Sequence, residues 1–271
     1  MTKAFVDTTV LTDSLLKPKT KGIAAKAALK RFDETLLPVY AIKEFKAGPM
    51  YYYVWTHNKF ALASSFQDAL EALHGMILSP RKYLPATAVE AIQTAVAENL
   101  SLSFKSLANK YGEKATANVA LRDLFRASLK VLILKAWKQR RTVTTEVVQP
   151  LTCYPEVGPT ASDLLIEMDT GKCKPEKECC LGPSLRKRTD DLKTLVETIK
   201  NLTEKPENDK RHKVLREISR KPTDAISETY CRGLGDAYFA LFCPKDAVIL
   251  STNISDHEPL ARALGKKAQD V

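Results

Sequence analysis

The chain has 271 residues, of which 44% are apolar and 27% charged, so it can bury a sizeable core. Its net charge of +10 and pI near 9.2 favour polyanionic partners, nucleic acid before anionic membrane surfaces. The N-terminus lacks the apolar run of a secretory signal, and the apolar run at 131–134 is too short to cross a bilayer. Six cysteines without an export signal indicate reduced thiols, so we expect a cytoplasmic protein with no membrane partner.

The first fifty residues are typical of two strand–helix pairs. A short apolar strand, AFV, ends at Asp7 and is followed by TTVLTDSLL, which has a helix-like start. A second strand, LLPVY at 36–40, leads directly into the helical segment AIKEFKAG. We expect Glu44 in the first turn of that helix and the Gly-Pro pair at 48–49 to end it.

The stretch from 51 to about 140 has mostly helical periodicity. In the segment NVALRDLFRASLKVLILKAWKQRR, Arg122, Arg126 and Lys130 fall at positions i, i+4 and i+8, so they form a basic stripe on one side of a helix. Such a stripe could bind a phosphate backbone, together with Lys138 and the arginines that follow. A solvated helix face without a ligand explains the same spacing equally well.

Residues 142–183 break the helical pattern. The segment TVTTEVVQPLTCY is strand-like, and the following loop-like region holds four cysteines: Cys153, Cys173, Cys179 and Cys180. With His212 further along, a structural zinc site is conceivable. The spacing argues against zinc, because it lacks a C-x-x-C pair and adjacent cysteines rarely ligate one ion. Buried thiols are the default interpretation.

The chain closes on an alternating plan. A helix near 190–202 precedes the polar segment NLTEKPENDKRHK, which we interpret as a turn or linker. LGDAYFALFCP is then a helix opened by Asp236, AVILSTN is a buried strand, and SDHEPLARALG is a short helix that Asp256 opens and Gly265 closes.

Four acidic residues therefore follow a strand or open a helix: Asp7, Glu44, Asp236 and Asp256. In an open parallel sheet, ligands bind beyond the carboxyl ends of the strands, where all four would meet. Carboxylates crowded together repel one another unless a cation lies between them, and oxygen ligands select Mg²⁺ or Mn²⁺ over zinc. Any one of these acids alone is better explained as a helix cap or a solvated charge.

Three segments resemble the PIN-domain family: FVDTTVLTDSLL, PVYAIKEFKAG and LGDAYFALFCPKDAVILSTNISDHEPLARALG. The resemblance covers about the first 50 and last 40 residues, and the closing block is the more specific part. It implies that the four acids form the family's acidic quartet, with Asp7, Asp236 and Asp256 as metal ligands and Glu44 orienting or deprotonating the attacking water. It also implies that Thr252 and Asn253 are accessory polar residues at the substrate. PIN domains usually join the Glu and the third acid by a short helical segment, whereas residues 45–235 intervene here.

The expected fold is α/β with three layers, a central mainly parallel sheet of four or five strands flanked by helices. Its nuclease core would be discontinuous, 1–50 and 222–271, with a largely helical, cysteine-containing insertion at 51–221 packed on it. The expected function is Mg²⁺- or Mn²⁺-dependent cleavage of RNA, preferred over DNA because of the resemblance alone. A protein partner or a homo-oligomer stays open.

Two alternatives stay open: a structure-specific DNA nuclease with the same site, and a nucleic-acid- or partner-binding protein with a vestigial site. A third possibility is a toxin-like nuclease that a separate protein silences. All nuclease readings require Asp7 and Asp236 to lie together, with neither closed in an ion pair with an arginine.

Overall fold

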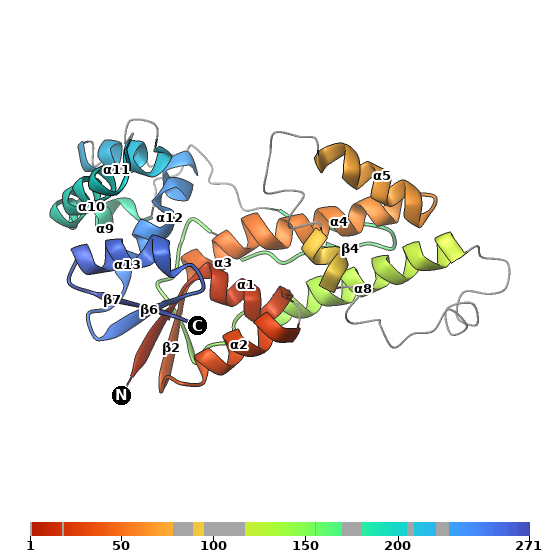
Figure 1. The fold of residues 1–271 in the computed structure, drawn as a ribbon, viewed down its shortest axis with the longest axis horizontal. Coiled ribbons are helices and arrows are strands. Elements are labelled where there is room, and N and C mark those ends of the chain that lie inside the picture. Colours follow the sequence, from red (N-terminus) through yellow and green to blue (C-terminus); the bar gives the residue numbers. More distant parts are fainter. Residues whose placement is uncertain are drawn as a thin grey trace.

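The computed structural model describes residues 2–17, 19–77, 89–94, 117–154, 156–169, 180–204, 209–220 and 228–271. Among them, five strands form a central sheet in the order β3-β2-β1-β6-β7, and every neighbouring pair is parallel (Figure 1). The strands are β1 (Lys3–Val6), β2 (Glu34–Pro38), β3 (Glu146–Val148), β6 (Ala247–Ser251) and β7 (Lys267–Asp270). The prediction of an α/β fold with a mainly parallel sheet flanked by helices is confirmed.

The helices lie around this sheet and extend well beyond it. In Figure 1, one group projects to the right of the sheet and another gathers at the upper left. The first group is α4 (Tyr51–Leu62), α5 (Phe66–Ile77) and α8 (Ala117–Gln139). The second group is α9 (Gly182–Arg186), α10 (Thr189–Leu202), α11 (Lys210–Arg220) and α12 (Glu228–Phe242). Closer to the strands lie α1 (Thr8–Leu16), α2 (Lys19–Leu29), α3 (Val39–Phe45) and α13 (Ile254–Ala263).

The central strands are apolar because helices cover them. Phe5 of β1 and Ile249 of β6 are fully buried, and Phe239 of α12 meets Phe5 edge-on with ring centroids 6.0 Å apart. Parallel strands enclosed in this way are continuous apolar runs rather than alternating ones. These runs made β1 and β6 recognisable in the sequence.

The two edge strands, β3 and β7, complete the central sheet. β3 lies inside the segment 51–221 and pairs with β2, so this segment contributes a strand to the central sheet as well as helices. β7 follows α13 and pairs with β6, so β6 is not the last strand of the chain. β7 reads KAQD and is mostly exposed, which explains why no apolar pattern marks it.

Two local predictions were wrong. Glu44 is the sixth residue of α3 and not in its first turn, because the helix already begins at Val39. The Gly-Pro pair at 48–49 does not end the helix but lies inside a π-helical turn (Lys46–Met50) that leads into α4. A π-helical turn shifts the backbone hydrogen bonds by one residue, so it can include a proline, which has no N–H to donate.

The segment predicted to be a polar turn or linker also holds a helix. Asp209 accepts hydrogen bonds from the backbone N–H groups of Arg211 and His212 and so caps α11. Leu215 and Ile218 give that helix its buried side. Among the described residues, no helix combines the length and apolar character needed to span a membrane.

Candidate active site

The candidate site lies at the carboxyl edge of the sheet, between β1 and β6. From β1 the chain passes to β2 on one side, and β6 and β7 lie on the other, so the strand order reverses at this point. Such a reversal leaves a crevice beyond the strand ends where ligands bind in α/β folds. Asp7 follows β1 and Ser251 ends β6, and the Ser251 hydroxyl donates a hydrogen bond to Asp7 Oδ2 at 2.9 Å.

Asp7 is buried and held from several sides. Its Oδ1 accepts the Thr8 N–H at 2.6 Å, and its Oδ2 accepts the Thr9 hydroxyl at 2.6 Å, so Asp7 also caps α1. Burial opposes its ionisation, but hydrogen bonds from His257, Thr9 and Ser251 outweigh burial and hold the Asp7 pKa below its usual value. Asp7 is therefore an ionised carboxylate with a fixed orientation.

His257 joins Asp7 to Asp236. Its Nε2 lies 3.3 Å from Asp7 Oδ2 and 3.5 Å from Asp236 Oδ1, so both carboxylates face a single ring atom. The imidazole is 1% exposed, and its Nδ1 has no hydrogen-bond partner among the described residues. Burial alone would lower its pKa, but the hydrogen bond to Asp7 and the charges of the nearby aspartates raise it. The two acids therefore favour the protonated form of His257.

Asp236 is positioned by a break in α12. The helix is interrupted at Gly235, whose φ of 41° and ψ of −124° suit glycine, so Asp236 opens the second half as predicted. The Gly235 N–H donates to Tyr40 Oη at 3.1 Å, and the Tyr40 ring stacks on Tyr238 at 3.9 Å between centroids. α3 therefore fixes the break in α12. Burial and the charges of Asp7 and Asp256 raise the pKa of Asp236.

Glu44 is linked to Asp7 through Thr8. The Thr8 hydroxyl donates to Glu44 Oε2 at 2.7 Å, so one residue links the first two acids of the predicted set. Burial, followed by the charges of Asp7 and Asp236, raises the pKa of Glu44 to about 8. A nearby cation would favour the ionised form, so Glu44 is sensitive to charge at this site.

The closing segment supplies Asp256 and its neighbours. Asp256 is in the first turn of α13, and the side-chain amide of Asn253 donates to its Oδ2. The Thr252 N–H donates to the Thr9 hydroxyl at 3.2 Å, and Thr252 itself is exposed. Asn253 therefore orients one acid of the set, and Thr252 borders the site at the surface.

Arg211 of α11 completes the group of charges. Its Nη1 lies 3.5 Å from Asp256 Oδ1 and 3.9 Å from Asp236 Oδ2, while its Nη2 lies 3.2 Å from Asp209 Oδ2. The contact with Asp236 is long, and the Asp236 side chain is 29% exposed. Asp236 is therefore paired with Arg211 only at the outer limit of an ion pair, and its carboxylate is still partly open to solvent.

The chain matches no protein-family model, and no curated protein or solved structure is significantly similar to it.

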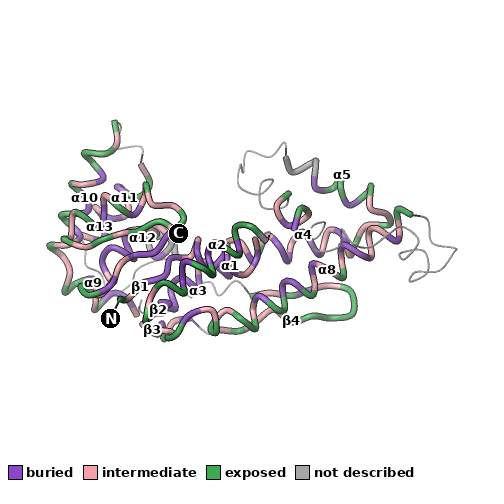
Figure 2. Tube along the Cα trace, turned by 60° about the horizontal axis from the view of Figure 1, so that its bottom comes forward, coloured by how far each residue is buried: buried purple, intermediate pink, exposed green. Residues whose placement is uncertain are grey.

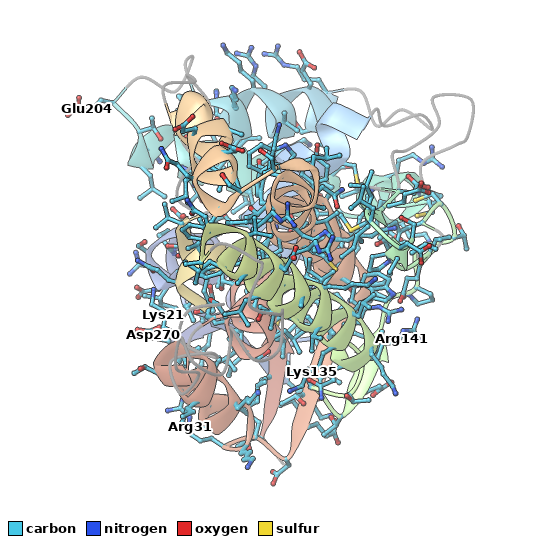
Figure 3. The ribbon with its side chains drawn as sticks, turned by 90° about the vertical axis from the view of Figure 1, so that its right-hand side faces the viewer. Lys21, Arg31, Lys135, Arg141, Glu204 and Asp270 are labelled. Carbon is cyan, nitrogen blue, oxygen red and sulfur yellow. The ribbon has the colours of Figure 1, made fainter. Side chains whose placement is uncertain are left out.

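The predicted basic stripe is occupied with other contacts. Arg122 Nη1 donates to the carbonyl oxygens of Ala63 and Ser64, Arg126 lies 3.9 Å from Asp123, and Lys130 Nζ donates to Ser162 O. None of these contacts reaches the four acids. Figure 3 shows α8 running obliquely across the view, with Lys135 on the helix and Arg141 just beyond its C-terminal end. The role of the stripe in substrate binding stays a prediction.

The cysteines are brought together only in part. Cys153 and Cys180 have their Sγ atoms 3.0 Å apart, and Cys173 and Cys179 lie outside the described residues. His212 is buried on α11, where its backbone N–H contributes to the Asp209 cap. The interpretation of the cysteines as thiols without zinc stays a prediction.

Asp7, Glu44, Asp236 and Asp256 offer the oxygen ligands that a divalent ion requires. Among the described residues, no three Cys, His, Asp or Glu side chains are arranged to hold a metal ion as they stand. Their chemistry fits a hard cation nevertheless. Asp236 and Asp256 share Arg211 Nη1, while Asp7 and Asp236 share His257 Nε2, so these two side chains already lie between the acids. A divalent ion would have to compete with these two side chains.

Three residues at the site were missed or given other roles in the sequence. His257 is not among the predicted site residues, and Arg211 and Asp209 lie in the segment predicted to be a turn or linker. The helix containing Arg211 could have been found from the sequence, because an Asp cap precedes Leu215 and Ile218 at a helical spacing. Its approach to the acids is a tertiary contact that no local pattern encodes.

Proposed function

We propose that this protein is a divalent-metal-dependent nuclease that hydrolyses phosphodiester bonds in RNA, and that its core is PIN-like with three layers. The observation that carries the proposal is the meeting of Asp7 and Asp236 at His257 Nε2, at 3.3 and 3.5 Å. These acids come from opposite ends of the chain, and helix capping of each acid alone gives no reason for them to converge. The resemblance to PIN domains supports RNA as the substrate.

The four acids divide into two roles in this proposal. Asp7, Asp236 and Asp256 would hold Mg²⁺ or Mn²⁺, which when bound polarises a phosphate oxygen and lowers the pKa of water. Glu44 faces the same site and would accept the proton of the attacking water in its ionised form. The water oxygen bonds to phosphorus, the bond to the leaving oxygen breaks, and that oxygen takes a proton from solvent.

A non-catalytic nucleic-acid-binding role is the second candidate. It is favoured by Arg211 and His257, which already supply positive charge between the acids without a metal ion. In that case the site would be a closed set of ion pairs, and divalent ions would bind weakly. Metal titration separates the two candidates directly.

The test compares Asp236→Asn with the matched control Asp246→Asn. Asp246 precedes β6 at the opposite edge of the sheet, and its side chain is 64% exposed. Both changes remove one negative charge. We expect Mn²⁺-dependent cleavage of a fluorescent RNA oligonucleotide to fall at least about 1,000-fold in Asp236→Asn and to persist in Asp246→Asn. Equal cleavage by the wild type and Asp236→Asn would reject the nuclease assignment.

The same experiment also distinguishes RNA from DNA as the substrate, and the nuclease from the non-catalytic role. A DNA oligonucleotide of the same sequence, tested in parallel, decides between ribonuclease and DNA nuclease. Calorimetric titration with Mn²⁺ measures whether the acids bind the ion. A wild-type protein that binds RNA, takes up no Mn²⁺ and cleaves neither oligonucleotide would favour the non-catalytic role.

A further inference from the structure

α11 brings a dense positive charge to the edge of the candidate site. Five of its eleven residues are lysine or arginine, against one glutamate, and the helix packs on α12, which carries Asp236. Figure 1 shows α11 beside α12 and above α13, the helix that carries Asp256. Helix α11 places positive charge directly beside the acids. It suits a site where a polyanion must approach carboxylates.

Arg211 is the residue of α11 that reaches the acids, and the two Nη atoms of its guanidinium are held differently. Asp209 Oδ2 lies 3.2 Å from Nη2, and Asp209 Oδ1 accepts the Arg211 backbone N–H at 2.7 Å. In contrast, Nη1 lies at the longer distances of 3.5 and 3.9 Å from Asp256 and Asp236. The side chain is 44% exposed, so a ligand can reach Nη1 from solvent.

We propose that Arg211 is the residue that binds the phosphate of the substrate, through a non-bridging oxygen of the phosphodiester that enters the site. This inference rests on the proposed nuclease function. The guanidinium is planar and stays charged, so Nη1 can donate a charge-assisted hydrogen bond to a phosphate oxygen while Nη2 stays paired with Asp209. Asp209 holds it against the acids, so the phosphate would be positioned at the candidate metal ligands rather than elsewhere on the surface.

The contacts favour α11 over the basic stripe of α8 for this role. Arg122 and Lys130 donate to backbone carbonyl oxygens in the structure, and such contacts would have to break before either could bind phosphate. Arg211 Nη1 makes only long contacts to acids that a divalent ion would also attract. Exchanging these contacts for a phosphate oxygen therefore costs less on α11 than on α8.

The experiment compares Arg211→Gln and Arg211→Lys with Arg220→Gln as the matched control. Arg220 is exposed at the far end of α11, about 13 Å along the helix axis, and its replacement removes the same charge. Cleavage of a short oligouridylate in Mn²⁺ is measured, together with binding of the same fluorescent oligouridylate in Ca²⁺. We expect kcat/KM to fall about 10- to 100-fold in Arg211→Gln, less in Arg211→Lys, and less than about threefold in Arg220→Gln.

Arg211→Gln should also bind Mn²⁺ at least as tightly as the wild type, because a cation competing for Asp236 and Asp256 is removed. A purely structural role would lower cleavage and Mn²⁺ affinity together and would overturn the inference. Faster cleavage by Arg211→Gln would identify Arg211 as an inhibitor and overturn it as well. Equal losses in Arg211→Gln and Arg220→Gln would show a general charge effect instead.

Failure of the inference and failure of the proposed function give different results. If the wild type cleaves and Arg211→Gln cleaves equally well, the nuclease stands and the role of Arg211 is rejected. If the wild type does not cleave with Mn²⁺, the nuclease function is rejected. Binding of oligouridylate in Ca²⁺ still tests the role of Arg211. Arg211→Gln should weaken this binding more than Arg220→Gln does only if Arg211 binds the phosphate.

Discussion

The carboxylate site and the basic stripe of α8 both gather charges of one sign, but their surroundings act on these charges in opposite ways. At the site, burial and neighbouring charges raise the pKa of Glu44 and of Asp236, so their ionised forms are disfavoured. On α8, Arg122 and Lys130 donate hydrogen bonds to carbonyl oxygens and so tie the helix to neighbouring segments. Figure 2 shows buried and exposed stretches alternating along α8, as expected when one side of a helix packs and the other is solvated. The ionised forms of Glu44 and Asp236 therefore destabilise the fold, whereas the hydrogen bonds of Arg122 and Lys130 stabilise it.

This difference has a functional meaning. Proteins tend to keep unfavourable charge where a ligand or a reaction needs it, and they place structural charges where partners satisfy them. If the comparison is sound, removing charge should stabilise the metal-free protein at the site and destabilise it on α8. Four variants distinguish these opposite signs, and they are ordered from the largest expected change in the free energy of unfolding to the smallest.

Glu44→Gln should give the largest effect. The folded-state pKa of about 8 lies above the ordinary value of 4.5, so the native protein binds more protons than the unfolded chain between these pH values. Wild-type stability should therefore fall as the pH rises from 4.5 to 8. The variant should lose this dependence and gain on the order of 4 kcal/mol relative to the wild type at pH 8 compared with pH 5.

Urea unfolding of both proteins across this pH range, without divalent ions, measures that difference. His257, whose pKa is also raised, contributes a fall of the same direction to both proteins and so cancels in the comparison. Parallel stability curves for the wild type and Glu44→Gln would show that the Glu44 carboxyl is not held in an unfavourable state.

Arg122→Gln should act in the opposite direction. Arg122 Nη1 ties α8 to the carbonyl oxygens of Ala63 and Ser64, and its Nη2 pairs with Asp123 at 2.9 Å. Losing these hydrogen bonds should lower the free energy of unfolding by about 2 kcal/mol. Lys138→Gln, on the last turn of the same helix, is the control of equal charge. A loss no larger than that of the control would show that the Arg122 contacts contribute nothing specific.

Asp236→Asn should stabilise the metal-free protein by about 0.5–1 kcal/mol. Burial and the charges of Asp7 and Asp256 disfavour the ionised form, although the variant also loses the attraction of His257. The gain should be present above the ordinary pKa of aspartate and vanish at lower pH, where the wild-type carboxyl is protonated. Thermal unfolding at two pH values measures it. Saturating Mn²⁺ should stabilise only the wild type if the acids bind the ion.

The sequence predicted the elements that have a local pattern and missed those that depend on tertiary contacts. The apolar runs of β1 and β6 predicted the sheet, and the positions of Asp7 and Asp236 relative to strand and helix predicted their meeting at its edge. β7 is polar and exposed, so nothing in its composition indicates a strand.

The sequence also could not predict which positive charges face which acids. Helical spacing placed Arg122, Arg126 and Lys130 on one side of a helix, but the spacing is the same for a ligand-binding face and for one that packs on a loop. Arg211 reaches the site because α11 packs on α12, and the sequence pattern does not predict this contact. The identity of a charge is local information, whereas its partner is set by the fold.

Lys130→Gln should give the smallest effect of the four. Lys130 Nζ makes a single hydrogen bond to the Ser162 carbonyl oxygen at 3.2 Å, in an exposed setting that links α8 to the loop between β4 (Thr160–Ala161) and β5 (Ile166–Glu167). We expect a loss of about 0.5 kcal/mol, since water replaces a hydrogen bond at the surface. A Lys130→Gln protein more stable than the wild type, measured by urea unfolding, would reverse the sign. It would mean that the stripe on α8 is itself held in an unfavourable state, as expected of a binding surface.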